Sequence, residues 1–189
     1  MNRLFMESGF VSLNKQGEDL CGDFFTTVAD EDATTFVLSD GMGSGVKANI
    51  LSTLTSSIIS TMLNEGATVE QAVETIANTL PVCNVRKLAY STFSILQISD
   101  NGDAYLVEFD NPPCIFIRNG EVQEMEPEFR QMAGKNITEC RFTVRPGDVL
   151  ALVSDGVIYA GVGQALNFGW NWDNVSAWLA KATLKEKSA

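Results

Sequence analysis

The 189 residues carry 24 acidic and 13 basic side chains, and the formal net charge of −11 argues against binding to nucleic acid or to an anionic membrane. With 45% hydrophobic residues and no linker-like segment, we expect a single folded domain over residues 1–189, with a monomer favoured. No apolar run reaches the roughly 20 residues of a membrane-spanning helix, and the start lacks a signal peptide, so we expect a cytoplasmic protein.

The residue types that are missing limit the chemistry. The chain has no histidine, which removes the usual general base at neutral pH and the commonest transition-metal ligand. Its cysteines, Cys21, Cys83, Cys114 and Cys140, lie too far apart to form the close spacings of zinc sites or redox pairs. We predict reduced, mostly buried thiols. Because histidine is absent, any reaction chemistry must depend on carboxylates, thiols, hydroxyls or a hard metal ion.

The first part of the chain has the pattern of strands. Residues 5–13 and 24–28 are predicted to be extended, and residues 34–39 form a compact run with high strand propensity. This run ends at Asp40-Gly41, where the strand pattern stops.

Two helices are predicted next. Apolar residues recur at helical spacing between Ile50 and Met62, and Gly66 is expected to end that helix. Thr68 and Gln71 form a candidate capping box for a second amphipathic helix, which Pro81 should end.

From Ser91 onward the pattern changes to short apolar runs separated by turns. Asn101-Gly102 and Asn119-Gly120 predict two hairpins. Residues 141–144 and 149–154 flank the turn sequence 145–148 and predict a third hairpin, all within an antiparallel sheet.

A final amphipathic helix is predicted over Asn174–Leu184. Helices and strands are grouped along the chain instead of alternating. This grouping predicts an α+β fold of layered sheets and helices, and it disfavours a parallel doubly wound sheet.

Three aspartates stand beside glycines near the ends of apolar strands, in Gly22-Asp23, Asp40-Gly41 and Asp155-Gly156. Carboxylates at strand ends can point into a shared cleft, and carboxylate and carbonyl oxygens are the ligands of Mg²⁺ or Mn²⁺. A two-metal site would activate water without a histidine base. Each pair taken alone is also an ordinary turn sequence.

The sequence motifs around these aspartates strengthen the interpretation as a metal site. Residues 21–24 (CGDF), 38–45 (LSDGMGSG) and 153–157 (VSDGV) resemble successive motifs of PP2C-type metal-dependent protein phosphatases, and Asn111-Pro112-Pro113 is similar to a loop of that family. The order and spacing match the bacterial SpoIIE/RsbX-like branch over about residues 5–165.

The resemblance implies an α-β-β-α sandwich, with two central, mostly antiparallel sheets flanked by helices, and a cleft that holds two Mn²⁺ or Mg²⁺ ions. Asp40 would bridge the ions and the Gly41 carbonyl would bind one of them. Asp155 would bind the first ion, and Asp23 would serve the second, directly or through water. Asp40 and Asp155 would act in catalysis through a metal-activated water. The implied activity is hydrolysis of phosphoserine or phosphothreonine on a STAS-type or stressosome protein.

The chain departs from the family pattern at its end. The family continues with a helix and a Gly-Asp-Asp-x-Thr-like word that opens a last strand, so residues 1–189 are expected to lack the final helix and strand. Asp173 is a poor substitute ligand because it opens a helical pattern. The first metal is therefore expected to bind weakly.

Several alternatives remain open. The domain could be a catalytically weak module that binds a phosphoprotein, and the glycines after Asp40 also suggest a nucleotide site, although neither the Walker nor the dinucleotide pattern is complete. Lys15 and Lys47 are candidates for phosphate contacts without a motif match. Cys21 is not expected to be a nucleophile because Thr26, not arginine, stands five residues later.

Overall fold

The computed structural model describes residues 4–79, 91–132, 135–163 and 165–185. The strands are β1 Asp23–Ala29, β2 Ala33–Gly41, β3 Ser91–Ser99, β4 Asp103–Phe109, β5 Ile115–Arg118, β6 Glu121–Val122, β7 Glu128–Met132, β8 Lys135–Thr143 and β9 Val149–Ala151. The helices are α1 Gly45–Asn64, α2 Val69–Thr79, α3 Asp155–Ile158 and α4 Trp172–Thr183.

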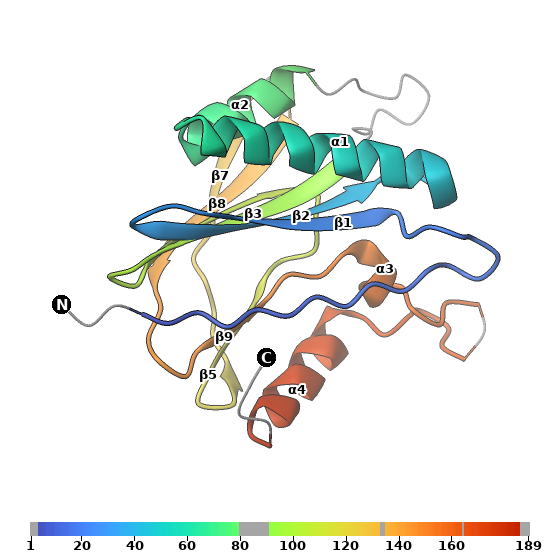
Figure 1. The fold of residues 1–189 in the computed structure, drawn as a ribbon. Coiled ribbons are helices and arrows are strands. Elements are labelled where there is room, and N and C mark those ends of the chain that lie inside the picture. Colours follow the sequence, from blue (N-terminus) through green and yellow to red (C-terminus); the bar gives the residue numbers. More distant parts are fainter. Residues whose placement is uncertain (1–3, 80–90, 133–134, 164, 186–189) are drawn as a thin grey trace.

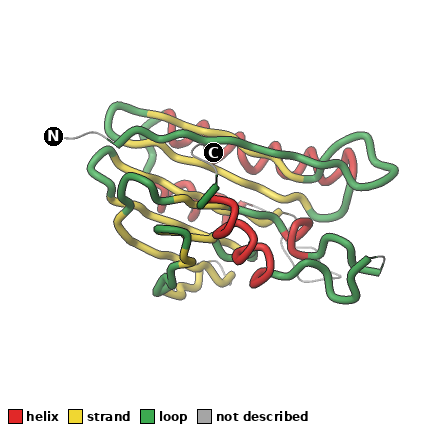
Figure 2. The backbone as a smooth tube through the Cα atoms, turned by 90° about the horizontal axis from the view of Figure 1, so that it is seen from below, coloured by secondary structure: helices red, strands yellow, loops and turns green. Residues whose placement is uncertain are grey.

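The elements stack in layers (Figure 1). Helices α1 and α2 cover one face of a six-stranded antiparallel sheet of order β1-β2-β3-β4-β8-β7, and a three-stranded sheet of order β6-β5-β9 lies on its other side. Helix α4 packs outside the small sheet, on the side opposite to α1 (Figure 2). This is the α+β arrangement of central sheets and outer helices that the sequence predicts.

Strand periodicity explains the layering, because successive side chains point to opposite faces of a strand. In β3, Phe93 and Ile95 join the hydrophobic cluster under α1 and α2, whereas Leu96 and Ile98 join the cluster between the sheets. In β5, Ile115 and Ile117 face α4 and belong to a third cluster. Each space between layers therefore has its own apolar core.

Several local predictions are confirmed. Thr68 and Gln71 form the reciprocal capping box, in which the Thr68 N–H donates to Gln71 Oε1 and the Gln71 N–H donates to Thr68 Oγ1. Hairpins connect β3 to β4 and β5 to β6, and α4 covers most of the predicted last helix. Cys114 and Cys140 are buried free thiols and Cys21 is half-buried, whereas Cys83 and Pro81 lie outside the described residues.

Two predictions are wrong. Residues 141–144 and 149–154 do not pair as a hairpin: β8 pairs with β4 and β7, and β9 pairs with β5. The turn at residues 145–148 instead carries the chain from one sheet to the other. Residues 5–13, predicted to be extended, form no strand, although Met6 in this range and the preceding Leu4 pack against the cluster between the sheets.

Across the described residues, the helices are too short or too polar to span a membrane.

Candidate metal centre

Two of the predicted aspartates face each other across the first strand pair. Asp23 is the first residue of β1 and stands opposite Asp40, near the end of β2, in the antiparallel register. Side chains directly opposite each other in such a pair lie on the same face of the sheet. The β1–β2 pairing therefore brings Asp23 and Asp40 together at one end of the large sheet.

The third aspartate arrives from the other layer. Asp155 is the first residue of α3, which follows β9 of the small sheet. The preceding residue, Ser154, is buried and donates a hydrogen bond from Oγ to Asp23 Oδ2 at 2.8 Å. This contact ties the start of β1 to the start of α3, so the cluster lies where the two sheets meet.

Asp40 is the electrostatic centre of the cluster. Burial raises its pKa to about 8, with further contributions from the charges of Asp23 and Asp155 and from hydrogen bonds with both carboxyl groups. Carboxylates held this close repel one another when ionised, and a bound cation would relieve the repulsion. A carboxyl group that is partly exposed and whose pKa is strongly raised is typical of functional sites.

The backbone around Asp40 packs too closely for side chains. A Cβ on Gly41 would collide with the backbone of Ala48 in α1, whose Cα would be 2.9 Å away. A Cβ on Gly22 would lie 3.7 Å from the Gly41 carbonyl oxygen and 3.9 Å from Asp40 Oδ1. The carbonyl and the carboxylate predicted as ligands therefore lie beside the same glycine.

The segment before β1 is fastened to the beginning of α1. Ser44 donates from Oγ to Glu18 Oε1 at 2.7 Å, and Asn49 donates from Nδ2 to the Cys21 carbonyl at 2.9 Å. The sequence gives no signal for Glu18. Ser154 lies within the motif of residues 153–157, but its contact with Asp23 joins distant segments and could not be expected from the pattern. Cys21 has a structural part, since its Sγ accepts the Asp23 N–H at 3.4 Å.

Asn111 of the Asn-Pro-Pro loop is held by β3. It donates from Nδ2 to Ser94 Oγ at 2.8 Å and accepts from Thr92 Oγ1 at 3.4 Å, and Thr92 stands opposite Asp40 in the β2–β3 register. The loop is thus anchored next to the strand end that carries Asp40, and its expected role in shaping the cleft stays a prediction.

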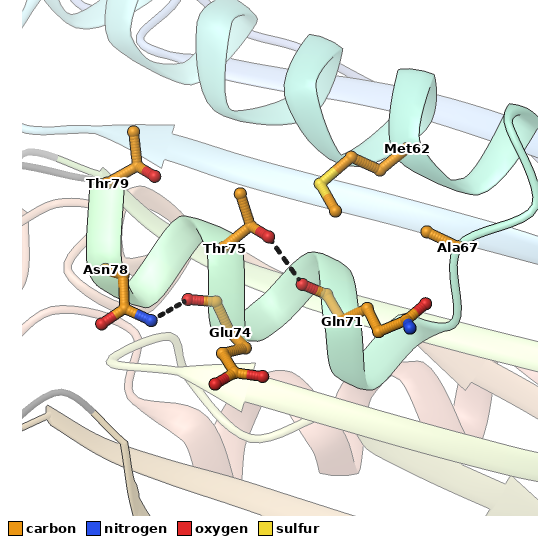
Figure 3. Close-up of a pocket in the computed structure, with 7 residues that line it drawn as sticks. All are labelled: Met62, Ala67, Gln71, Glu74, Thr75, Asn78 and Thr79. Carbon is orange, nitrogen blue, oxygen red and sulfur yellow. Dashed lines mark hydrogen bonds between the residues drawn. The ribbon is translucent and has the colours of Figure 1, made fainter.

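The remaining candidates do not join the cluster. Lys15 and Lys47 are exposed, and Asp173 lies in the first turn of α4, where it is also exposed. A groove of about 550 Å³ lies between the end of α1 and α2 (Figure 3). Of the described residues that line it, Glu74 alone is ionisable, so that groove lacks the groups for metal or phosphate chemistry.

The donor set fits a hard divalent cation. Among the described residues, no three Asp, Glu or Cys side chains lie close enough together to hold a metal ion between them, so the three aspartates form a looser cluster centred on Asp40. Their oxygens, together with the neighbouring Gly41 carbonyl, are the ligand type that Mg²⁺ and Mn²⁺ prefer, and Mg²⁺ commonly completes its shell with water.

Comparison with known proteins agrees with this interpretation of the fold. The family model for SpoIIE, stage II sporulation protein E, matches residues 30–184, a range that includes Asp40, Gly41 and Asp155 but not Asp23. No curated protein sequence matches the chain significantly.

Solved structures share the fold at low sequence identity. The PP2C phosphatase domain with a fragment of the regulatory domain of SpoIIE from Bacillus subtilis is 19% identical, with a TM-score of 0.74, and the match covers 94% of this chain and 50% of that one. The RsbU and RsbW domains of Rv1364c from Mycobacterium tuberculosis are 17% identical, with a TM-score of 0.72 and coverages of 90% and 48%.

The chain therefore spans about half the length of these two structures. RsbX in complex with magnesium is 23% identical, with a TM-score of 0.63 and coverages of 92% and 85%. The family match and the layered sheets lead to one conclusion: the chain belongs to the SpoIIE family and has the fold of its PP2C-type phosphatase domains.

Proposed function

We propose that this chain is a metal-dependent protein phosphatase that hydrolyses phosphoserine or phosphothreonine. The observation that carries the proposal is the carboxylate cluster of Asp23, Asp40 and Asp155 at the junction of the two sheets, within a PP2C-type fold. Within this cluster the pKa of Asp40 is raised, and Asp155 is exposed to solvent.

In this proposal Asp40 would help to hold both ions. Asp155 and the Gly41 carbonyl would serve the first, and Asp23 would serve the second. Bound Mg²⁺ or Mn²⁺ would supply an activated water and neutralise phosphoryl charge, which removes the need for a histidine base.

The surrounding residues hold the ligands in place. Ser154 fixes Asp23 by its hydrogen bond, so that this carboxylate keeps its orientation toward Asp40. Ala48 of α1 packs against Gly41, which sets the position of the backbone carbonyl. The exposed Asp155 leaves the cluster open on the side where a phosphoryl group must enter.

The proposed substrate is a phosphorylated STAS-type or stressosome protein. Support comes from the relatives, which include RsbX, the RsbU and RsbW domains of Rv1364c, and a structure of the bacterial stressosome system that is 17% identical with a TM-score of 0.64. These names describe those proteins, and the assignment to this chain rests on the shared fold.

The test measures phosphate release from p-nitrophenyl phosphate with Mn²⁺, with Mg²⁺ and with EDTA. We expect turnover with a divalent ion, none with EDTA, and a loss of about a hundredfold or more in Asp40→Asn. Asp103→Asn, at the opposite end of the large sheet, should keep full activity. Turnover that survives Asp40→Asn would disprove the metal mechanism, and inactive protein that still binds a phosphoprotein would favour the binding module.

A further inference from the structure

The loop between α3 and α4, which follows the helix that Asp155 opens, exposes large apolar side chains. Phe168 is 85% exposed, Tyr159 61%, Val162 50% and Leu166 42%. Exposed apolar side chains that gather on one segment mark interaction sites more often than scattered ones do. The residues described here are 159–163 and 165–171, which we call the apolar loop.

The backbone of the apolar loop is ordered by its own hydrogen bonds. Val162 and Leu166 form a β-bridge, and the Leu166 N–H donates to the Gly161 carbonyl at 2.9 Å. Closer to α4, the Asn171 N–H donates to the Ile158 carbonyl at 3.0 Å. The exposure of the side chains is therefore a property of a built loop and not of an unfolded segment.

The loop is also unusual in charge. None of residues 156–172 is Asp, Glu, Lys or Arg, in a chain with a net charge of −11. A docking surface made from the average surface of this chain would be acidic and would repel a phosphorylated segment, which itself carries close to two negative charges. An uncharged surface next to the cluster avoids that repulsion.

The loop continues directly from the candidate site. Asp155 opens α3, and the loop begins right after this helix ends, at Tyr159. The four residues of α3 separate Asp155 from Tyr159 by about 6 Å along the helix axis, and two residues of an extended peptide span about the same distance. Figure 1 shows α3 and the segment that follows it at the end of the molecule where α1 begins. A phosphoresidue held beside Asp155 would have residues about two positions away within reach of Tyr159, where the apolar loop begins.

We infer that the apolar loop is the docking surface for the residues that flank the phosphorylated serine or threonine, and that it selects substrates with apolar side chains about two or more positions from the phosphate. This rests on the proposed function of the site. A second copy of the chain fits the surface less well, because two chains of charge −11 repel each other.

The test compares two fluorescent phosphoserine peptides by anisotropy in EDTA buffer, where the proposed phosphatase activity is expected to be absent and the peptides stay phosphorylated. One carries Leu two residues before and after the phosphoserine, and the other carries Ser at both positions. We expect about tenfold tighter binding of the Leu peptide, and loss of that preference in Phe168→Ser and in Tyr159→Ser, since an aromatic anchor supplies much of the affinity of such a surface. Phe129→Ser, a substitution of another exposed phenylalanine on β7, is the matched control and should keep the preference.

Equal binding of both peptides by the unmodified chain, or a preference that survives both loop substitutions, would overturn the inference. So would a dimer in sedimentation that Phe168→Ser converts to a monomer, because the surface would then belong to self-association. Turnover of p-nitrophenyl phosphate separates the two proposals, because this compound has no flanking residues. If the chain does not turn it over, the phosphatase assignment fails. A preference for the Leu peptide would still support the docking surface.

Discussion

Acidic side chains at the two ends of the six-stranded sheet have opposite surroundings. At the end where β1 turns into β2, Asp30 Oδ1 accepts the N–H groups of Asp32 and Ala33, both at 2.8 Å. At the end where β1 begins and β2 finishes, Asp23 and Asp40 face each other and Asp155 joins them.

The pKa values follow this division. Asp148 lies near the end of the sheet where β1 turns into β2, which we call the turn end. Its partial burial favours a higher pKa, but hydrogen bonds from Arg118 and from the Arg145 N–H outweigh that effect, so the pKa of Asp148 is lower than usual. The pKa of Glu70 at the start of α2 is lowered as well, because hydrogen bonds from its own N–H, from Thr68 and from Arg141 exceed the effect of burial. Burial and two neighbouring carboxyl groups raise the pKa of Asp40.

A lowered pKa means that folding favours the charged acid, and a raised pKa means that folding opposes it. The acids at the turn end therefore stabilise the fold, whereas the Asp40 cluster weakens it when no cation is bound. Residues that weaken a fold are expected where function requires them. Glu108 of β4 sharpens the contrast, because burial alone raises its pKa to about 7, partly offset by the Cys114 N–H, with no carboxylate neighbour.

The largest effect is expected where the cluster is packed most tightly. Gly41→Ala places a Cβ into the Ala48 backbone, so α1 must shift, and we expect the free energy of unfolding to fall by about 3 kcal/mol or more. Denaturant titration measures this loss. Gly156→Ala is the control, because its Cβ would meet only Ser154 Oγ at 3.6 Å, and an equal loss in both variants would contradict the packing explanation.

Glu108→Gln tests whether a buried carboxyl without carboxylate neighbours acts only on stability. The pKa of Glu108 is higher in the folded state than its ordinary value of 4.5, so the folded state binds the proton more tightly and stability falls as pH rises from 4.5 to about 7. At pH 8 we expect Glu108→Gln to be more stable than the unmodified chain by about 3 kcal/mol, and nearly equal to it at pH 4.5. Urea titrations at both pH values check this, and a gain that does not depend on pH would count against it.

The Asp40 cluster should respond to an ion where Glu108 does not. With Mn²⁺ or Mg²⁺ at a hundred times its dissociation constant, the folded state gains about 2.7 kcal/mol. We expect thermal unfolding to show this gain in the unmodified chain and in Glu108→Gln, and to show little of it in Asp40→Asn. Stabilisation of Asp40→Asn to the same degree would place the ion elsewhere.

The smallest effect is expected at the turn end. Asp148→Asn removes the paired hydrogen bonds with Arg118, at 2.7 and 2.8 Å, and we expect the melting temperature at pH 7 to fall by about 2–4 °C. Because the folded pKa of Asp148 is lowered, its contribution is present above the unfolded pKa of about 3.9 and is lost as pH falls through the folded value. Melting curves of both proteins should therefore converge in acid, and a difference that persists there would point to packing.

The sequence predicted the parts of this structure that depend on local chemistry. The capping box of Thr68 and Gln71 and the hairpin at Asn101-Gly102 follow from residues that are neighbours in the chain, and both are confirmed. The wrong hairpin at residues 145–148 shows the limit: a turn sequence specifies that the chain reverses but not which strand the next segment meets. In the structure β9 pairs with β5, and Val149 and Ala151 of β9 pack against the cluster under α4.

The site was predictable as a set of residues and not as a geometry. The motifs singled out Asp23, Asp40 and Asp155, and the structure brings their carboxyl groups together, whereas their role as metal ligands stays a prediction. The contacts of Ser154 and Glu18 could not be predicted, because they join segments whose approach depends on the whole fold. The expected absence of a final helix and strand also stays a prediction.

The hydrogen bond from Ser154 to Asp23 joins residues 131 positions apart, and this separation bears on how the protein folds. Contacts between such distant segments form after the chain has met the entropy cost of closing a long loop, so they belong to the slow part of folding. During synthesis, β1 can pair with β2 early, but Asp23 cannot accept the hydrogen bond from Ser154 until β9 and the start of α3 have left the ribosome. Binding of the ion would then require that the small sheet and α3 have packed against the large sheet. A chain that stops before α3 would form β1 and β2 but would lack Asp155.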